Sequence, residues 1–216
     1  MKPYLITLVL TLLLAILIVA AGEHSAGITA EGGIVENTTV LLYAGLVIAL
    51  LFFADKLTPV NRGLGSLLIL FLMLRELDFH KKFTTFGIFK TELYRSPDVA
   101  LVEKFLAGGF ILLLVTITYL LLRSNLSRLL SGIKKGHRTA CGILAALILV
   151  GCSKVLLDGL PRKLEKLGME ANEFVVRHHG TLEETLELAI PACLLLSVFY
   201  AQFPSKKTRI EKAKGH

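Results

Sequence analysis

The sequence predicts an all-α fold, a polytopic bundle of about six transmembrane helices that forms one domain over residues 1–216. Composition gives the first indication: 54% of the 216 residues are hydrophobic and 19% are charged, whereas charged residues make up about 25% of a typical soluble domain. The second is that the apolar residues gather in runs close to the roughly 20 residues with which a helix crosses a bilayer. This composition excludes secreted disulfide scaffolds, disordered chains and large soluble enzymes.

Six apolar runs are the expected spans, and they cover residues 4–21, 39–54, 63–80, 105–122, 139–158 and 184–203. The first run has two interpretations, because a cleaved signal peptide also combines an early Lys2 with small residues after the apolar stretch; its length favours a retained helix. Residues 79–94 alternate aromatic and Lys side chains, which suits the headgroup layer. Residues 161–176 repeat apolar side chains at helical spacing, which predicts an amphipathic interfacial helix on the outer side.

Positive charges fall between alternate spans. Residues 55–62, 123–138 and 206–216 are each net positive, and 123–138 contains five Lys and Arg with no acid. The first segment on the opposite side, residues 22–38, contains three Glu and no Lys or Arg. This asymmetry predicts a multi-pass protein of the cell inner membrane with both termini in the cytoplasm. The positive charges are not interleaved with aromatics on one surface, so nucleic acid is not an expected partner.

The third span is short of apolar residues. Its uncharged stretch, residues 64–74, has only 11 residues, about half of what a crossing helix needs. Counting about 20 residues from Arg62 at the inner interface reaches the neighbourhood of Lys82. The charged motif that begins at Arg75 is therefore expected to lie within the outer part of the bilayer.

The same count places ionisable groups of four helices at one level. Seven acids against Arg75 and Lys154 give this level a formal charge of −5. Charged groups inside a membrane are costly unless they pair or line a polar cavity, although Lys154 has the simpler alternatives of snorkelling outward or pairing with Asp158. We predict a polar binding cluster that consists of Glu36, Arg75, Glu76, Asp78, His80, Asp158, Glu183, Glu184 and Glu187.

Helical spacing predicts which of these groups meet. If the third helix continues to His80, Arg75 and Asp78 share one face, and Glu76 and His80 share another. Arg75 would then serve either in a binding pocket or in an ion pair that fixes helix packing. Glu76 and His80 are candidate ligands of a divalent metal or members of a proton relay, and no other cofactor is expected. Catalytic residues are not identified by any motif.

Three motifs carry a resemblance to known proteins. They are residues 35–37 (Val-Glu-Asn), residues 75–84 (which begin Arg-Glu-Leu-Asp-Phe-His) and residues 183–187 (Glu-Glu-x-x-Glu). Together they resemble small bacterial inner-membrane proteins that carry no assigned activity, which implies a bacterial polytopic protein with outward polar motifs. Membrane-embedded metal hydrolases present several His and Asp on their helices, but here only His80 lies at the right level, so no site is transferred.

Two functions follow. The first is an integral membrane protein whose outer acid-rich pocket binds a cation, a cationic small molecule or a lipid headgroup, as a transporter or an assembly factor. The sequence has no internal repeat of the kind common in transporters. The second is a membrane-embedded hydrolase, metal-dependent or not, of a lipid or lipid-linked substrate, with Glu76 or Glu184 as general base. Membrane lipid is a partner under both hypotheses, and the sequence indicates no oligomeric state.

Overall fold

The structure is a computed structural model, and it describes residues 2–21, 27–29 and 32–202. The basic tail at 206–216 lies outside the described residues, as do residues 22–26 and 30–31 of the acidic segment at 22–38. All regular secondary structure in the described part is helical. The helices are α1 (Lys2–Ala20), α2 (Ile34–Phe53), α3 (Pro59–Glu76), α4 (Phe79–Lys82), α5 (Thr91–Arg95), α6 (Leu101–Lys134), α7 (Arg138–Gly151), the π-helix η2 (Cys152–Leu157), α8 (Leu160–Lys166) and α9 (Glu173–Gln202).

Five helical segments among the described residues are long and apolar enough to cross a membrane, and these are α1, α2, α6, α7 with η2, and α9. They correspond to five of the six expected spans. Helix α3 has 18 residues and includes Arg62, Arg75 and Glu76, and it is not among the five. The protein therefore has the composition of a membrane protein. The expected third span, residues 63–80, corresponds to α3, and the charged residues of α3 set it apart from the five apolar segments.

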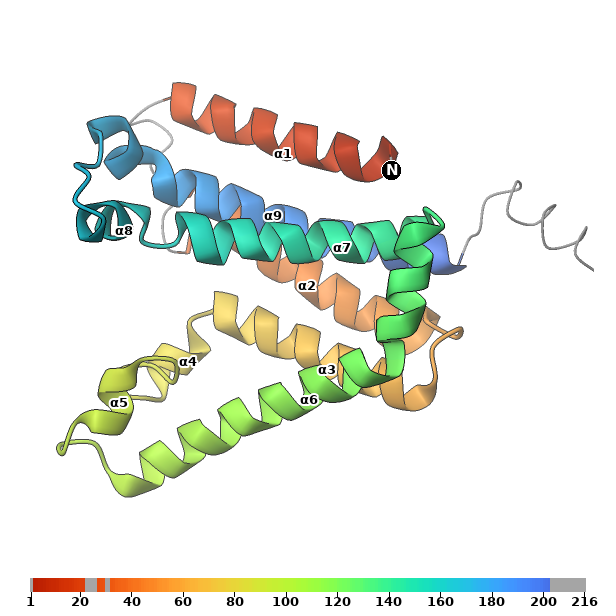
Figure 1. The fold of residues 1–216 in the computed structure, drawn as a ribbon, viewed down its shortest axis with the longest axis horizontal. Helices are drawn as coiled ribbons and strands as arrows, with labels where there is room; N and C mark the ends of the chain where they lie inside the picture. Colours follow the sequence, from red (N-terminus) through yellow and green to blue (C-terminus); the bar gives the residue numbers. More distant parts are fainter. Residues whose placement is uncertain (1, 22–26, 30–31, 203–216) are drawn as a thin grey trace, which may run out of the picture.

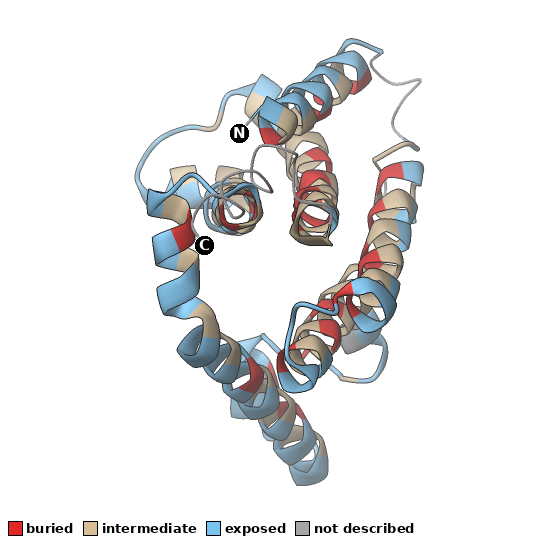
Figure 2. Ribbon diagram, turned by 90° about the vertical axis from the view of Figure 1, so that its right-hand side faces the viewer, coloured by how far each residue is buried: buried red, intermediate tan, exposed pale blue. Residues whose placement is uncertain are grey.

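Helix α9 lies at the centre of the bundle and packs against α1, α2 and α7. Helix α3 packs on α2, and α6 lies beyond α3 (Figure 1). Only 11% of the apolar window of α6 is buried, against 22–39% for the other four apolar helices. Buried residues lie on helix sides that face the interior of the bundle, and exposed residues dominate the outward sides (Figure 2). An apolar outward surface is the arrangement that a lipid solvent requires.

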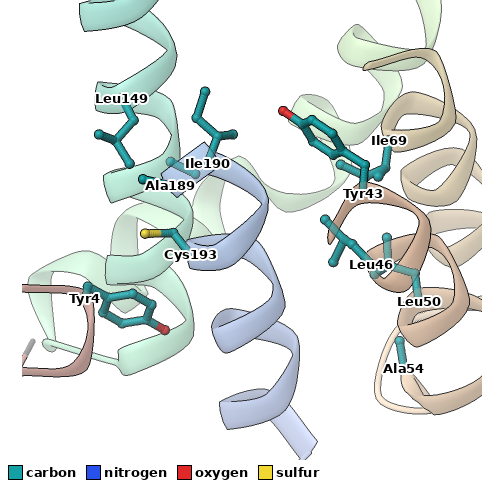
Figure 3. Packing of buried hydrophobic residues seen from close by; sticks show 11 residues of the cluster. Tyr4, Tyr43, Leu46, Leu50, Ala54, Ile69, Leu149, Ala189, Ile190 and Cys193 are labelled. Carbon is teal, nitrogen blue, oxygen red and sulfur yellow. The ribbon is translucent and has the colours of Figure 1, made fainter. Parts of the chain in front are cut away.

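The core joins α9 to four other helices. Tyr4 of α1, Leu46 of α2, Ile69 of α3 and Leu149 of α7 belong to one buried cluster with Cys193 of α9 (Figure 3). Small residues permit close helix contact, as is typical of membrane bundles. Because the cluster draws on helices that are far apart in sequence, it fixes the end of α3 relative to α9.

One expected loop is helical. Residues 123–138 were predicted to be an inner loop, but α6 continues without interruption to Lys134 and has 34 residues. At 1.5 Å per residue this is about 50 Å, longer than the roughly 30 Å hydrocarbon core, and the last part of the helix bends toward α7 (Figure 1). At the bend, Asn61 Nδ2 donates to Asn125 Oδ1 at 3.3 Å and Ser124 Oγ donates to Asn61 Oδ1 at 3.0 Å.

The expected amphipathic helix over residues 161–176 is shorter than predicted. Helix α8 ends at Lys166, and Gly168 follows with a φ of +75°, a conformation that glycine adopts without strain. The apolar residues Phe174 and Val175 belong to α9 instead. The turns before α3 and α7 lie at one end of the bundle, together with the N-terminus, whereas α4, α5 and α8 lie at the other end (Figure 1).

Candidate functional site

A π-helical turn positions two adjacent polar side chains. Helix α7 passes directly into η2 (Cys152–Leu157), and Asp158 N donates to Ser153 O at 2.9 Å across five residues. Such π-turns are rare and often occur at functional sites. Adjacent residues of a regular α-helix point about 100° apart, so one partner rarely engages both. Here Ser153 and Lys154 both engage Glu187 of α9.

Glu187 is the most buried acid of the cluster. The residue is 2% exposed, and Ser153, which is fully buried, donates from Oγ to Glu187 Oε1 at 2.7 Å. Lys154 Nζ forms an ion pair with the same oxygen and donates to Glu183 Oε1 at 2.9 Å. Glu183 lies one helical turn before Glu187, so both carboxylates project from the same face of α9. A lysine shared by two carboxylates leaves one negative charge uncompensated.

Helix α9 lacks one backbone hydrogen bond one turn after Glu187. Pro191 lies inside the helix and is itself buried. Proline has no backbone N–H, so position 191 cannot donate to the carbonyl of residue 187 as a regular helix requires. The carbonyl and the carboxylate of Glu187 therefore both add acceptor capacity at this level of the bundle.

The end of α3 supplies the opposing acid. Glu76 is the last residue of α3, its side chain is 8% exposed, and its carboxyl group lies within electrostatic range of that of Glu187. Arg75 Nη1 lies 3.9 Å from Glu76 Oε1, a distance that is electrostatic rather than hydrogen-bonding. Two helices thus bring two carboxyl groups near one another, with one loosely placed guanidinium beside them.

Two more side chains lie near this pair of carboxyl groups. Tyr43 of α2 is 2% exposed and lies within electrostatic range of Glu76 and Glu187, and Figure 3 shows its ring on the inner side of α2. Glu184 lies within the same range of Glu187, Lys154 and Glu36. Sequence reasoning did not select Tyr43 or Ser153. Tyr43 follows Glu36 by seven residues, which places it on the same helix face, whereas Ser153 depends on the π-turn and had no comparable signal.

Several predicted site residues do not meet as expected. Asp78 has a φ of +52° and ends the helical path of α3, so the prediction that Arg75 and Asp78, and Glu76 and His80, share faces of one continuous helix is wrong. His80 belongs to the separate helix α4, and its side chain lies outside the described residues. Asp158 is exposed beyond the π-turn. The physical reason is that spacing rules hold only within one uninterrupted helix.

Glu36 lies at the margin. Its Oε2 accepts a hydrogen bond of 2.7 Å from the exposed Gly32 N–H, in the manner of an acid that stabilises a helix start. Its interaction with the other acids is an electrostatic one with Glu184.

The structure therefore gathers a smaller set than expected. We call this set the carboxylate cluster: Glu76, Glu183, Glu184 and Glu187 with Arg75, Lys154, Ser153 and Tyr43. Four acids against two bases give it a formal charge of −2, in place of the expected −5. No group of three or more His, Cys, Asp or Glu with metal-binding geometry was found among the described residues. What the cluster offers chemically is acceptor oxygens with a net negative charge.

Comparison with known proteins adds no assignment to this geometry. Searches with the chain found no matching family model, curated protein or solved structure.

Proposed function

We propose that this protein is an integral membrane protein that binds a cation at the carboxylate cluster. The observation that carries the proposal is the proximity of the carboxyl groups of Glu76 and Glu187, both of which are buried. Like charges repel, and at an effective dielectric constant of about 20 the repulsion between two unit charges reaches about 4 kcal/mol at about 4 Å. A positive charge between the two carboxylates replaces this repulsion by attraction.

The two basic residues of the cluster do not compensate all of its carboxylates. Lys154 pairs with Glu183 and Glu187, and Arg75 lies 3.9 Å from Glu76. Glu184 adds a further carboxylate within electrostatic range. We infer that a small inorganic cation or a protonated amine takes the remaining position, with carboxylate oxygens as ligands. Oxygen donors of this kind suit hard cations and ammonium groups.

The proposed orientation follows from the distribution of basic segments. The turns at 55–62 and 134–138 lie at one end of the bundle and the cluster lies toward the other, where α3 ends and α8 begins (Figure 1). Under the positive-inside rule the basic end is cytoplasmic. The cluster would then face the outer leaflet of the cell inner membrane, and the ligand would enter from outside, as in a transporter or a binding and assembly factor.

Thermal unfolding of the detergent-purified chain tests the proposal. We expect one of NaCl, KCl, MgCl2, CaCl2, ammonium chloride or methylammonium chloride, compared at equal ionic strength, to raise the unfolding temperature. A ligand at about 100 times its Kd stabilises a protein by about 2.7 kcal/mol. Glu187→Gln and Glu76→Gln should abolish the rise, whereas Glu165→Gln, an exposed acid of α8, should keep it.

Two results would contradict cation binding. The first is an unfolding temperature that responds equally to every salt. The second is a specific response that survives both Glu187→Gln and Glu76→Gln. Phospholipid hydrolysis by the same preparation that is lost in Glu184→Gln would instead support the hydrolase alternative.

A further inference from the structure

A second feature lies beside Arg75. A cavity of about 570 Å³ opens between α3, α6 and the segment 79–89. Its walls are mainly aromatic and aliphatic, with Phe71, Phe79, Phe83, Leu106 and Phe110 among the lining residues. The volume lies within the range of about 300–1,000 Å³ typical of small-molecule sites.

The walls of this groove are held in place by specific contacts. The rings of Phe71 and Phe110 meet edge to face with centroids 4.8 Å apart, which joins α3 to α6. A separate buried cluster that includes Ile88 and Leu93 packs against Phe110 and closes one end. Tyr94 Oη donates to Ile88 O at 2.8 Å. The groove is thus lined by packed side chains rather than by free loop ends.

The polar part of the lining includes one acid and one base. Glu103 lines the groove, and its carboxylate is held away from Arg75 by hydrogen bonds that it accepts from Thr85 N at 2.6 Å and Thr85 Oγ1 at 3.1 Å. Arg75 also lines the groove, and its side chain is 34% exposed. Its pairing with Glu76 at 3.9 Å is too long for a hydrogen bond. A guanidinium beside an apolar groove matches an anionic head on an apolar chain.

We propose that this groove is a binding site for a membrane phospholipid with an anionic headgroup. One acyl chain lies in the groove against Phe71, Phe83 and Leu106, and the phosphate lies at Arg75. A lipid is favoured over a soluble ligand because the outward residues of α6 around the groove are apolar and exposed, Val102 and Leu106 at 70% and Phe105 at 78%. The groove therefore opens onto the surface that faces hydrocarbon. This site does not depend on cation binding at the carboxylate cluster.

The sequence contains no tryptophan, which allows a site-specific fluorescence test. Phe110→Trp places the only indole in the groove, and Phe52→Trp places it on α2, where residue 52 is 71% exposed and outside the groove. Each protein is reconstituted in phosphatidylcholine vesicles that contain a minor fraction of phosphatidylglycerol with brominated chains, which quench indole on contact. Brominated phosphatidylcholine at the same fraction is the charge control.

We expect brominated phosphatidylglycerol to quench Phe110→Trp more than brominated phosphatidylcholine does, with an apparent preference of about fivefold for one basic contact. Phe52→Trp should show no such preference. Arg75→Gln should remove the preference, Arg75→Lys should retain most of it, and Glu187→Gln, which disables the proposed cation site, should leave it intact. Equal quenching of Phe110→Trp by the two lipids would overturn the proposal even if Arg75→Gln failed to fold. A preference that persists in folded Arg75→Gln would overturn the role of Arg75.

Discussion

The carboxyl groups of Glu76 and Glu187 lie within electrostatic range of one another although one ends α3 and the other lies inside α9. Both helices pack against α2. A buried acid needs partners, so this proximity couples the charged end of α3 to the central helix of the bundle.

Removing Lys154 should destabilise the protein more than removing Lys154 and Glu187 together. Lys154→Met leaves buried Glu187 without its ion-pair partner, and breaking one side of a buried pair costs about 3–5 kcal/mol. The double variant with Glu187→Gln should recover much of this loss in thermal unfolding. Lys166→Met, an exposed residue at the end of α8, is the matched control and should change little. A loss in the double variant equal to the sum of the losses in Lys154→Met and Glu187→Gln would show that the pair is not coupled.

Pro191→Ala should separate cation binding from stability. Alanine restores an N–H that can donate to the carbonyl of Glu187, so α9 gains the backbone hydrogen bond that Pro191 prevents. We expect unfolding without ligand to occur at an equal or higher temperature, whereas the cation-dependent rise should shrink because an acceptor at the cluster is consumed. Pro161→Ala, in the first turn of α8, should leave both quantities near those of the unmodified chain. An undiminished cation response in Pro191→Ala would show that the carbonyl of Glu187 is not part of the binding site.

Gly142→Ala should disrupt the contact between α1, α7 and α9. A Cβ at position 142 would overlap the ring of Tyr4 and the Oγ of Ser197. Overpacking of this kind costs about 1–3 kcal/mol or more. Gly45→Ala in α2 is the matched control, because a Cβ there meets nothing within 4 Å, and it should be neutral or stabilising since alanine favours the helix. Unfolding temperatures of the two variants that do not differ would contradict the packing of α1.

The Asn61 contacts should fix the bend of α6. Asn61→Leu removes the hydrogen bonds to Asn125 and Ser124, at a cost of about 0.5–1.5 kcal/mol for each bond. Ser124→Ala removes one of the two and should cost less. Distances between spin labels at the exposed positions 60 of α3 and 130 of α6 should broaden in Asn61→Leu only. A distribution as narrow as that of the unmodified protein would show that other contacts hold the bend.

The orientation can be tested with single cysteines in a variant whose native Cys141, Cys152 and Cys193 are replaced by Ala. Lys90→Cys and Lys166→Cys lie at the α8 end, and Lys135→Cys lies at the basic end. In intact cells a membrane-impermeant maleimide should label the first two and should label Lys135→Cys only after permeabilisation. The reverse pattern would mean that the basic end faces outward.

The sequence was sufficient to locate the helices that it makes strongly apolar. Expected spans at 39–54 and 139–158 coincide closely with α2 and with α7 joined to η2, because helix formation in lipid follows from local composition and length. The sequence also led to the prediction that Glu76 and Glu187 lie at one level of the membrane. That prediction used only the distance from a basic interface along each helix, which is a local quantity.

The tertiary structure decided which of these acids meet. Asp78 leaves the cluster because a left-handed residue ends α3, and Asp158 leaves it because the π-turn ends in an exposed segment. Ser153 joins it through the same π-turn. A helical period applies to residues of one unbroken helix, so it cannot reveal such interruptions. Contacts between α3 and α9 depend instead on how five helices pack, and packing is a property of all their facing surfaces at once.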